Sequence, residues 1–201
     1  MLKKTLILGA MLVLFRSSSC KNCVEATYQF QIDENFFPEQ DSLKVGDTAW
    51  LISDHSTKFI SGSGNEVDFP GSKMGTNVRV LQFPDTSTKA LGAIDAFEFI
   101  EIHGKETGGD YVPSENKGFW FDEVNSQYLL KIGFRAKRNG VYSISLGDAV
   151  GITSSRFTCV RANVSITNHN VNNHLYYYQN WRPGYVISDY EKTHMYCFKV
   201  Y

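Results

Sequence analysis

Two segments decide the fold: Gln127-Tyr128-Leu129-Leu130-Lys131-Ile132-Gly133-Phe134-Arg135 and Gly140-Val141-Tyr142-Ser143-Ile144-Ser145-Leu146. In both, large apolar side chains occupy every second position. A period of two places alternate side chains on opposite faces of a β-strand. The two segments therefore predict strands that bury one face and expose the other.

The same period recurs along most of the chain and predicts about ten strands in all. Each segment is bounded by Gly, Pro, Asn, Asp or Ser, which are residues typical of turns. No window shows a long apolar period of 3.6 residues with helix caps. The fold class expected from this pattern is all-β, a single antiparallel β-sandwich. The further predicted strands cover 27–32, 48–53, 77–83, 96–102, 118–121, 160–166, 174–179 and 194–200.

Two local features refine this expectation. A turn at Gly46-Asp47 leads into the strand that carries Trp50, which we expect to contribute to the core. The segment Lys137-Arg138-Asn139-Gly140-Val141-Tyr142 resembles the tyrosine corner of immunoglobulin-like sandwiches, in which a tyrosine early in a late strand binds upstream backbone. The alternative is a strand that starts at a glycine and merely buries a tyrosine.

The first twenty residues have the order of a secretory signal that ends in a lipidation site. Met1-Leu2-Lys3-Lys4 is cationic, residues 6–15 are apolar, and Ser17-Ser18-Ser19 precede Cys20. An apolar run of this length is too short to cross a bilayer, which requires roughly 20 residues. It resembles the bacterial lipoprotein box, which implies cleavage before Cys20 and acylation of its thiol. Earlier cleavage by an ordinary signal peptidase is the alternative, although no Ala-x-Ala site is present.

These features predict three regions: a lipoprotein signal peptide at 1–19, a tether at 20–25 and one β-sandwich domain at 26–201. The chain has 20 basic and 21 acidic residues, and removal of the signal takes away three basic residues and no acidic one. The mature domain is then mildly acidic and has no cluster of Lys and Arg. Such a surface argues against nucleic acid as a partner, because binding to phosphates requires clustered cations.

The cysteines are expected to follow the redox state of an extracytoplasmic compartment. If Cys20 carries lipid, three cysteines remain, and we expect a disulfide between Cys159 and Cys197, with Cys23 left unpaired. Strand parity groups Cys197 with Lys199 and so predicts a bridge on a solvent-facing side or at an edge. A bridge between Cys20 and Cys23 in an unlipidated protein is the alternative.

Several short pieces together resemble small uncharacterised lipoproteins of Bacteroidetes. They are the lipid box, the strand with Gly46-Asp47-Thr48-Ala49-Trp50, the strand with Gly140-Val141-Tyr142, and the ending Met195-Tyr196-Cys197-Phe198-Lys199-Val200. The resemblance implies an immunoglobulin-like β-sandwich held on the outer membrane by a lipid anchor, and it implies no activity. The expected location is therefore the cell envelope, outside the cytoplasm.

No motif predicts catalytic residues, a metal site or a cofactor. None of the five histidines forms a helical His-x-x-x-His pair, which zinc enzymes use. The neighbours Asp54 and His55 are more often solvated than catalytic. Glu98 and Glu101 would face opposite sides of a strand and could not flank one glycosidic bond. The expectation is a protein that is not an enzyme.

A segment rich in aromatic and amide side chains, residues 168–181, is the candidate ligand surface. Exposed Tyr and Trp rings beside amides suit contact with a carbohydrate or a protein. We expect Tyr177 and Trp181 to form this surface, with Tyr177, or else Tyr176 and Tyr178, pointing outward from a strand. The alternative is a loop and a core strand whose outward tyrosine only covers a neighbour.

The sequence thus favours a lipid-anchored, noncatalytic binding or assembly module, bound to the membrane through its lipid and engaging a glycan or another envelope protein. The alternatives are an envelope hydrolase whose active site is built from separate loops and a purely structural coat component. A deep cleft with acidic or histidine groups from different loops would favour the hydrolase.

Overall fold

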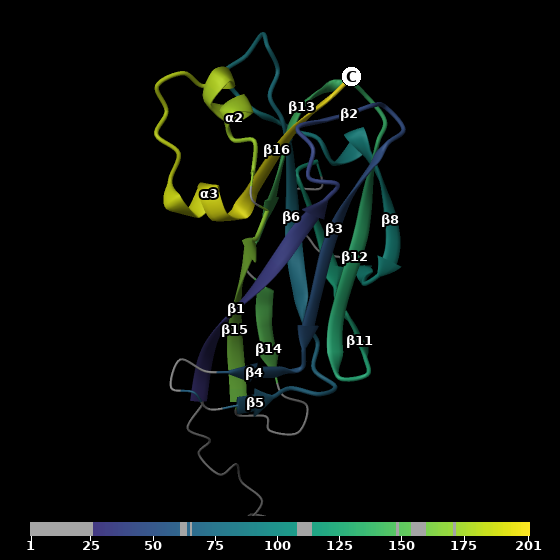
Figure 1. Cartoon of the computed structure of the whole chain (residues 1–201), viewed down its shortest axis with the longest axis vertical. Coiled ribbons are helices and arrows are strands. Elements are labelled where there is room, and N and C mark those ends of the chain that lie inside the picture. Colours follow the sequence, from purple (N-terminus) through teal and green to yellow (C-terminus); the bar gives the residue numbers. More distant parts are fainter. Residues whose placement is uncertain are drawn as a thin grey trace, which may run out of the picture.

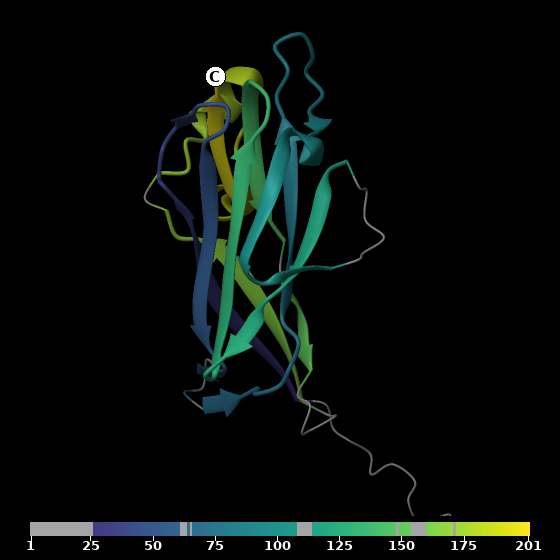
Figure 2. The same ribbon diagram turned by 90° about the vertical axis from the view of Figure 1, so that its right-hand side faces the viewer.

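A computed structural model of the protein describes residues 26–60, 64, 66–107, 114–147, 149–153, 160–170 and 172–201. The domain is elongated and consists mostly of strands that form two packed layers (Figures 1 and 2). This confirms the all-β sandwich that alternation predicts. Within the described residues, no helix combines the length and hydropathy needed to cross a bilayer.

The first layer is built around β12 (Gln127–Ala136), whose two edges pair with different strands. One edge pairs with β3 (Thr48–Ser56), and the other with β8 (Phe97–His103) and β11 (Asp122–Val124). A small hairpin of β4 (Lys58–Ile60) and β5 (Glu66–Asp68) follows β3. All these pairs are antiparallel.

The second layer is built around β6 (Gly75–Gln82) and β13 (Gly140–Leu146), which pair antiparallel. β16 (Met195–Val200) extends this layer beyond β13. The remaining strands attach at its edges. They are β2 (Ser42–Leu43), β7 (Leu91–Gly92), β9 (Lys105–Thr107), β10 (Asn116–Trp120) and β14 (Ala149–Thr153).

β1 (Ala26–Phe37) connects the two layers because it changes partner along its length. Its first nine residues pair in parallel with β15 (Val160–Asn168), and its last three pair antiparallel with β3. β15 pairs in turn with β14, which reaches β6. A second parallel pair joins β16 to β2. The sandwich is therefore mainly antiparallel, as expected, with two parallel pairs that alternation alone does not specify.

The core between the layers is aromatic. Phe36 of β1 stacks on Tyr196 of β16 with ring centroids 4.8 Å apart, and Phe97 of β8 contacts Tyr142 of β13 at 5.0 Å. Both contacts cross between the layers. Because a buried aromatic side chain removes a large apolar area from water, such contacts contribute much of the stability of the fold.

The tyrosine corner predicted at Tyr142 is confirmed. Its hydroxyl donates to the backbone carbonyls of Arg138 at 3.1 Å and Asn139 at 3.2 Å, and its ring is fully buried. The bonds tie the turn before β13 to the core, so the phenol is satisfied although it is buried.

The expectation for Trp50 is wrong. Ala49 and Leu51 point into the core, and Trp50 lies on the opposite face of β3, half-buried against Gly133 with the ammonium of Lys131 5.3 Å from its ring centroid. The indole covers the outside of the sheet, where Gly133 leaves room for it.

Glu34 is the one acidic side chain of the described residues that is wholly buried, with 0 % of its surface exposed. It lies where β1 changes partner: Glu34 is paired with Asn168 of β15, and the next residue, Asn35, with Ile52 of β3. Neither carboxylate oxygen has a hydrogen-bond partner among the described residues. Burial raises the pKa of Glu34 from 4.5 to about 8, so the carboxyl is neutral in the folded protein near pH 7.

The two poles of the domain differ in what they carry. The first described residues of β1 lie at one pole, shown at the bottom of Figure 1, and two short helices lie toward the other. These helices are α2 (Tyr176–Trp181) and α3 (Asp189–His194). They cover the outer face of the second layer, beside β13 and β16 (Figure 1).

Candidate functional site

The segment that carries the predicted ligand residues is a helix and not a strand. Tyr176–Trp181 forms α2, so the strand expected at 174–179 is wrong. On a helix, residues three and four positions apart share a face. Tyr178 is buried, and Trp181, three positions further on, packs beside it with ring centroids 5.8 Å apart. Tyr177 lies one turn before Trp181, four positions away.

An aromatic cluster fixes α2 to the sheet. The rings of Tyr178 and Trp181 lie 5.3 Å and 4.7 Å from that of Phe83, which directly follows β6. The indole nitrogen of Trp181 donates to the carbonyl of Ser87 at 2.8 Å and to that of Pro84 at 3.1 Å. Trp181 therefore holds the loop after β6 against the helix.

The second helix is held by a signal that is present in the sequence. Ser188 and Glu191 form a capping box, in which the Ser188 hydroxyl accepts from the Glu191 amide and the Glu191 carboxylate accepts from the Ser188 amide. The spacing Ser-x-x-Glu is typical of a helix start. Asn173 donates to the Lys192 carbonyl at 2.7 Å, which connects α3 back to the segment before α2.

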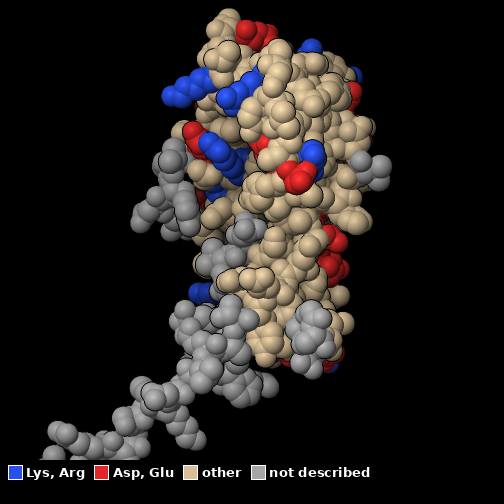
Figure 3. Space-filling model, turned by 90° about the vertical axis from the view of Figure 1, so that its left-hand side faces the viewer, with Lys and Arg blue, Asp and Glu red and all other residues tan. Residues whose placement is uncertain are grey.

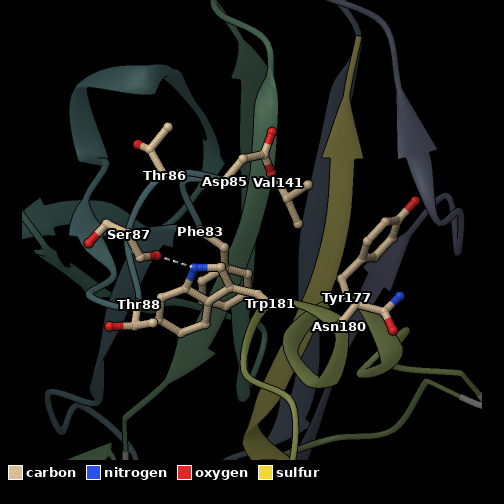
Figure 4. A pocket seen from close by; sticks show the side chains of 9 residues that line it. All are labelled: Phe83, Asp85, Thr86, Ser87, Thr88, Val141, Tyr177, Asn180 and Trp181. Atoms are coloured by element: carbon tan, nitrogen blue, oxygen red, sulfur yellow. Dashed lines mark hydrogen bonds between the residues drawn. The ribbon is translucent and has the colours of Figure 1, made fainter.

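The two predicted ligand residues meet at one cavity of about 420 Å³, here called the aromatic cavity. Tyr177, Asn180 and Trp181 line it from α2, and the loop after β6 supplies hydroxyl groups and one carboxylate from the other side (Figure 4). Residues 85–88 and Asn180 are exposed, so their polar groups are accessible to a ligand. The lining comprises Phe83, Asp85, Thr86, Ser87, Thr88, Val141, Tyr177, Asn180 and Trp181.

Tyr177 is held in place by its neighbour Tyr176. The two rings are 4.4 Å apart, and the Tyr176 hydroxyl donates to the Asp41 carboxylate at 2.9 Å. Tyr176, the one with the more exposed ring, thus anchors the helix, while half-buried Tyr177 faces the cavity. An immobilised aromatic ring loses little conformational entropy when a ligand stacks on it.

Of the four cysteines the structure describes Cys197 alone, so the expected disulfide between Cys159 and Cys197 stays a prediction. Cys20, Cys23 and Cys159 lie outside the described residues. Cys197 is a free thiol and is fully buried under α2, next to Tyr178 and Met195, so the solvent-facing position predicted for it is wrong. β16 is covered on both faces, by the core and by the helices, which strand parity alone does not reveal. Burial raises the pKa of the Cys197 thiol well above its ordinary value.

Glu98, Glu101 and His55, three of the four residues considered for catalysis, have structural partners, and the fourth, Asp54, is exposed. Glu98 pairs with Arg135 at 3.2 Å, and Glu101 accepts from the amide of Glu106 at 3.0 Å. His55 bonds through Nδ1 to the carbonyl of Ser56 at 2.7 Å and stacks on a phenylalanine ring. Within the described residues, no three His, Cys, Asp or Glu side chains gather as metal ligands.

No protein-family model and no curated protein matches the chain. Three solved structures illustrate the likeness found by shape. The human F-spondin reeler domain aligns at 12% identity and a TM-score of 0.34, over 73% of this chain and 98% of that one. The type II cohesin dyad from the adaptor ScaA scaffoldin of Acetivibrio cellulolyticus aligns at 10% identity and a TM-score of 0.37, over 70% of this chain and 47% of that one. The C-terminal domain of the Streptococcus agalactiae AgI/II polypeptide BspA aligns at 9% identity and a TM-score of 0.32, over 67% of this chain and 50% of that one. None of these carries an argument about function.

Proposed function

We propose that the protein is a noncatalytic binding module that takes a glycan chain in the aromatic cavity. The observation that carries the proposal is the convergence of Tyr177 and Trp181 with a rim of exposed hydroxyl, amide and carboxylate groups. Sugar rings present apolar C–H faces, which pack on aromatic rings, and hydroxyl groups, which bond to polar side chains. The cavity offers both kinds of contact side by side.

The size of the cavity favours a glycan over a protein partner. Its volume of about 420 Å³ lies in the range of small-molecule sites, roughly 300–1,000 Å³. A stable protein interface buries about 1,200 Å² or more and is built on a broad surface around buried anchors. A concave, hydroxyl-rimmed site suits a chain of sugar rings better.

We further propose that the module is anchored in the cell envelope, at the outer membrane, through lipid on Cys20. β1 spans 12 residues, or about 40 Å, from the pole where the tether joins toward the pole with the helices. An anchor at the first pole would leave the aromatic cavity well away from the membrane surface. This arrangement supports a role in holding an external ligand.

The glycan proposal is tested with the intact protein, purified in detergent, on an array of defined glycans. Tyr177→Ala is expected to weaken binding to any glycan that the wild type retains by about tenfold, because it removes one stacking face. Tyr201→Ala is the matched control, since Tyr201 is 55% exposed and does not line the aromatic cavity. Equal losses in the two variants, or no glycan retained by the wild type, would contradict the proposal.

The anchor is tested by mass spectrometry of the protein recovered from its own membranes. The expected mature protein begins at Cys20 and carries acyl chains, and Cys20→Ser is expected to leave the membrane fraction, because two acyl chains are needed for stable attachment. An uncleaved amino terminus, or a wild-type protein found mainly in the cytosol, would refute the anchor without affecting the glycan site.

A further inference from the structure

A second cavity, of about 630 Å³, continues the aromatic cavity along the outer face of the second layer. Phe83, Thr88 and Trp181 line both, so the two form one extended site with Trp181 at the junction. β6 and β13 supply the floor of the second cavity, and α2 and α3 supply one wall. A chain that stacks on Tyr177 and Trp181 could therefore extend past Trp181 without leaving the surface.

The second cavity has an excess of available positive charge. Of the charged groups that line it, Arg79 and Glu115 neutralise each other through two hydrogen bonds of 3.1 Å and 2.8 Å. The Glu191 carboxylate keeps its charge but is bound by neutral donors, the amide and hydroxyl of Ser188. Lys89 and Arg182 remain, so the charged groups of the cavity carry one net positive charge.

Neither remaining cation pairs with an acidic group in the described part of the chain. Lys89 lies on the exposed loop before β7, and the Arg182 guanidinium lies 4.6 Å from the ring centroid of Tyr185, directly after α2. Figure 3 shows several Lys and Arg side chains in the upper half of the face that carries the helices, with Asp and Glu side chains among them. A guanidinium held on an aromatic ring is well placed to bind a planar anionic group through paired N–H donors.

The floor of the second cavity contains an unsatisfied hydroxyl. Ser143 is 0 % exposed, and its Oγ has no hydrogen-bond partner among the described residues. Ser143 lies on β13 between Leu81 of β6 and Cys197 of β16, neither of which has a side chain that could accept a strong hydrogen bond. A buried hydroxyl without a partner costs free energy, which a ligand atom reaching it would recover.

We propose that the second cavity is an anionic subsite of the glycan site, in which Lys89 and Arg182 bind a carboxylate or sulfate substituent of the chain and Ser143 bonds to it or to an adjacent sugar hydroxyl. The inference rests on the proposed glycan function and specifies its ligand: a glycan of several sugar units with neutral rings at Tyr177 and Trp181 and a negative group beyond Trp181.

The test compares hexasaccharides by titration calorimetry with the intact protein in detergent. The neutral probes are cellohexaose, xylohexaose and chitohexaose. The uronate probes are hexagalacturonate and the hyaluronan hexasaccharide, and the sulfated probe is the chondroitin sulfate hexasaccharide. At least one anionic probe is expected to bind about tenfold or more tightly than every neutral probe, because hydrogen bonds to charged groups are the stronger ones. A uronate that binds as well as the sulfated chain identifies carboxylate as sufficient.

Charge-neutral variants locate the preference. Lys89→Gln combined with Arg182→Gln is expected to lower the affinity for the anionic probe at least tenfold and the affinity for the neutral probes less than twofold. Lys44→Gln combined with Lys105→Gln removes the same charge from exposed lysines that line neither cavity, and should change neither affinity. Ser143→Ala is expected to lower the affinity for the anionic probe about fivefold. Without ligand, the variant should be at least as stable as the wild type.

The outcomes separate the two proposals. If neutral and anionic probes bind with equal affinity and the double Gln variant changes neither affinity, the proposal of an anionic subsite is wrong and the glycan site stands. If an anionic preference survives in the double Gln variant, Lys89 and Arg182 are not its source and the subsite is likewise wrong. If no hexasaccharide binds, the glycan function falls, and the subsite with it.

Discussion

Raising the pH from 5 to 9 is expected to lower the free energy of unfolding by about 4 kcal/mol through Glu34 alone. This carboxyl is wholly buried, has no hydrogen-bond partner among the described residues, and its pKa is raised from 4.5 to about 8. Between these two values the folded protein holds a proton that the unfolded chain has lost. The contribution of Glu34 to the free energy of unfolding is therefore fully present below about pH 4.5 and declines as the pH rises to about 8, above which the buried carboxylate is charged.

Glu34→Gln is the control, because the amide has nearly the same shape and does not titrate. Urea unfolding of both proteins at pH 5 and pH 9 is expected to show a much smaller pH effect in the variant, which at pH 9 should be the more stable of the two. Burial lowers the pKa of His174, which has the opposite effect on stability, so the comparison between the two proteins isolates Glu34. The same pH effect in both would show that the carboxyl does not titrate as its burial indicates.

Phe36→Ala is expected to destabilise the fold by about 3–5 kcal/mol and to lower Tm by about 10 °C. The Phe36 ring is 1 % exposed, stacks on Tyr196 across the sandwich at 4.8 Å, and lies 6.3 Å from Phe134. Two hydrogen bonds of 2.7 Å join the backbone of Phe36 to the side chain of Asn170, and they do not depend on the ring. The loss therefore measures the ring contacts and the cavity left behind, and calorimetry of the purified variant gives its size.

Phe37→Ala is the matched control, one residue further along the same strand. Phe37 is 62% exposed, so its replacement should cost less than about 1 kcal/mol. The ratio between the two losses tests which face of β1 is inside. Similar losses in both variants would show that the alternation does not describe the packing of this strand.

Alternation in the sequence predicts most of the strands because most strands of this sandwich have one buried face. The segments at Gln127–Ala136 and Gly140–Leu146 are strands with the expected faces inside, and Tyr142 binds upstream backbone as expected. The prediction fails where both faces are apolar. In β3, Trp50 and Leu51 are neighbours, and which of them is inside depends on the sheet that covers the strand.

Long-range packing explains the other failures. The predicted strand stops at Ile32, before two acidic residues, whereas β1 continues through buried Glu34 to Phe37. The run Tyr176-Tyr177-Tyr178 suits either a strand or a helix, and contact with Phe83 favours the helix, which places Tyr178 and Trp181 against that ring. Composition alone identifies Tyr177 and Trp181 as a candidate surface. It does not identify the loop after β6 or Ser143, which meet them only in the folded chain.

The parallel pairing of β1 with β15 has a mechanical consequence. A load applied between residue 26 and a ligand held beside α2 acts largely along β1. Nine consecutive residue pairs would then be sheared together, where a hairpin pulled from its open end would separate one rung at a time. Stretching the domain between these two points should accordingly require a larger rupture force than pulling it apart across the strands.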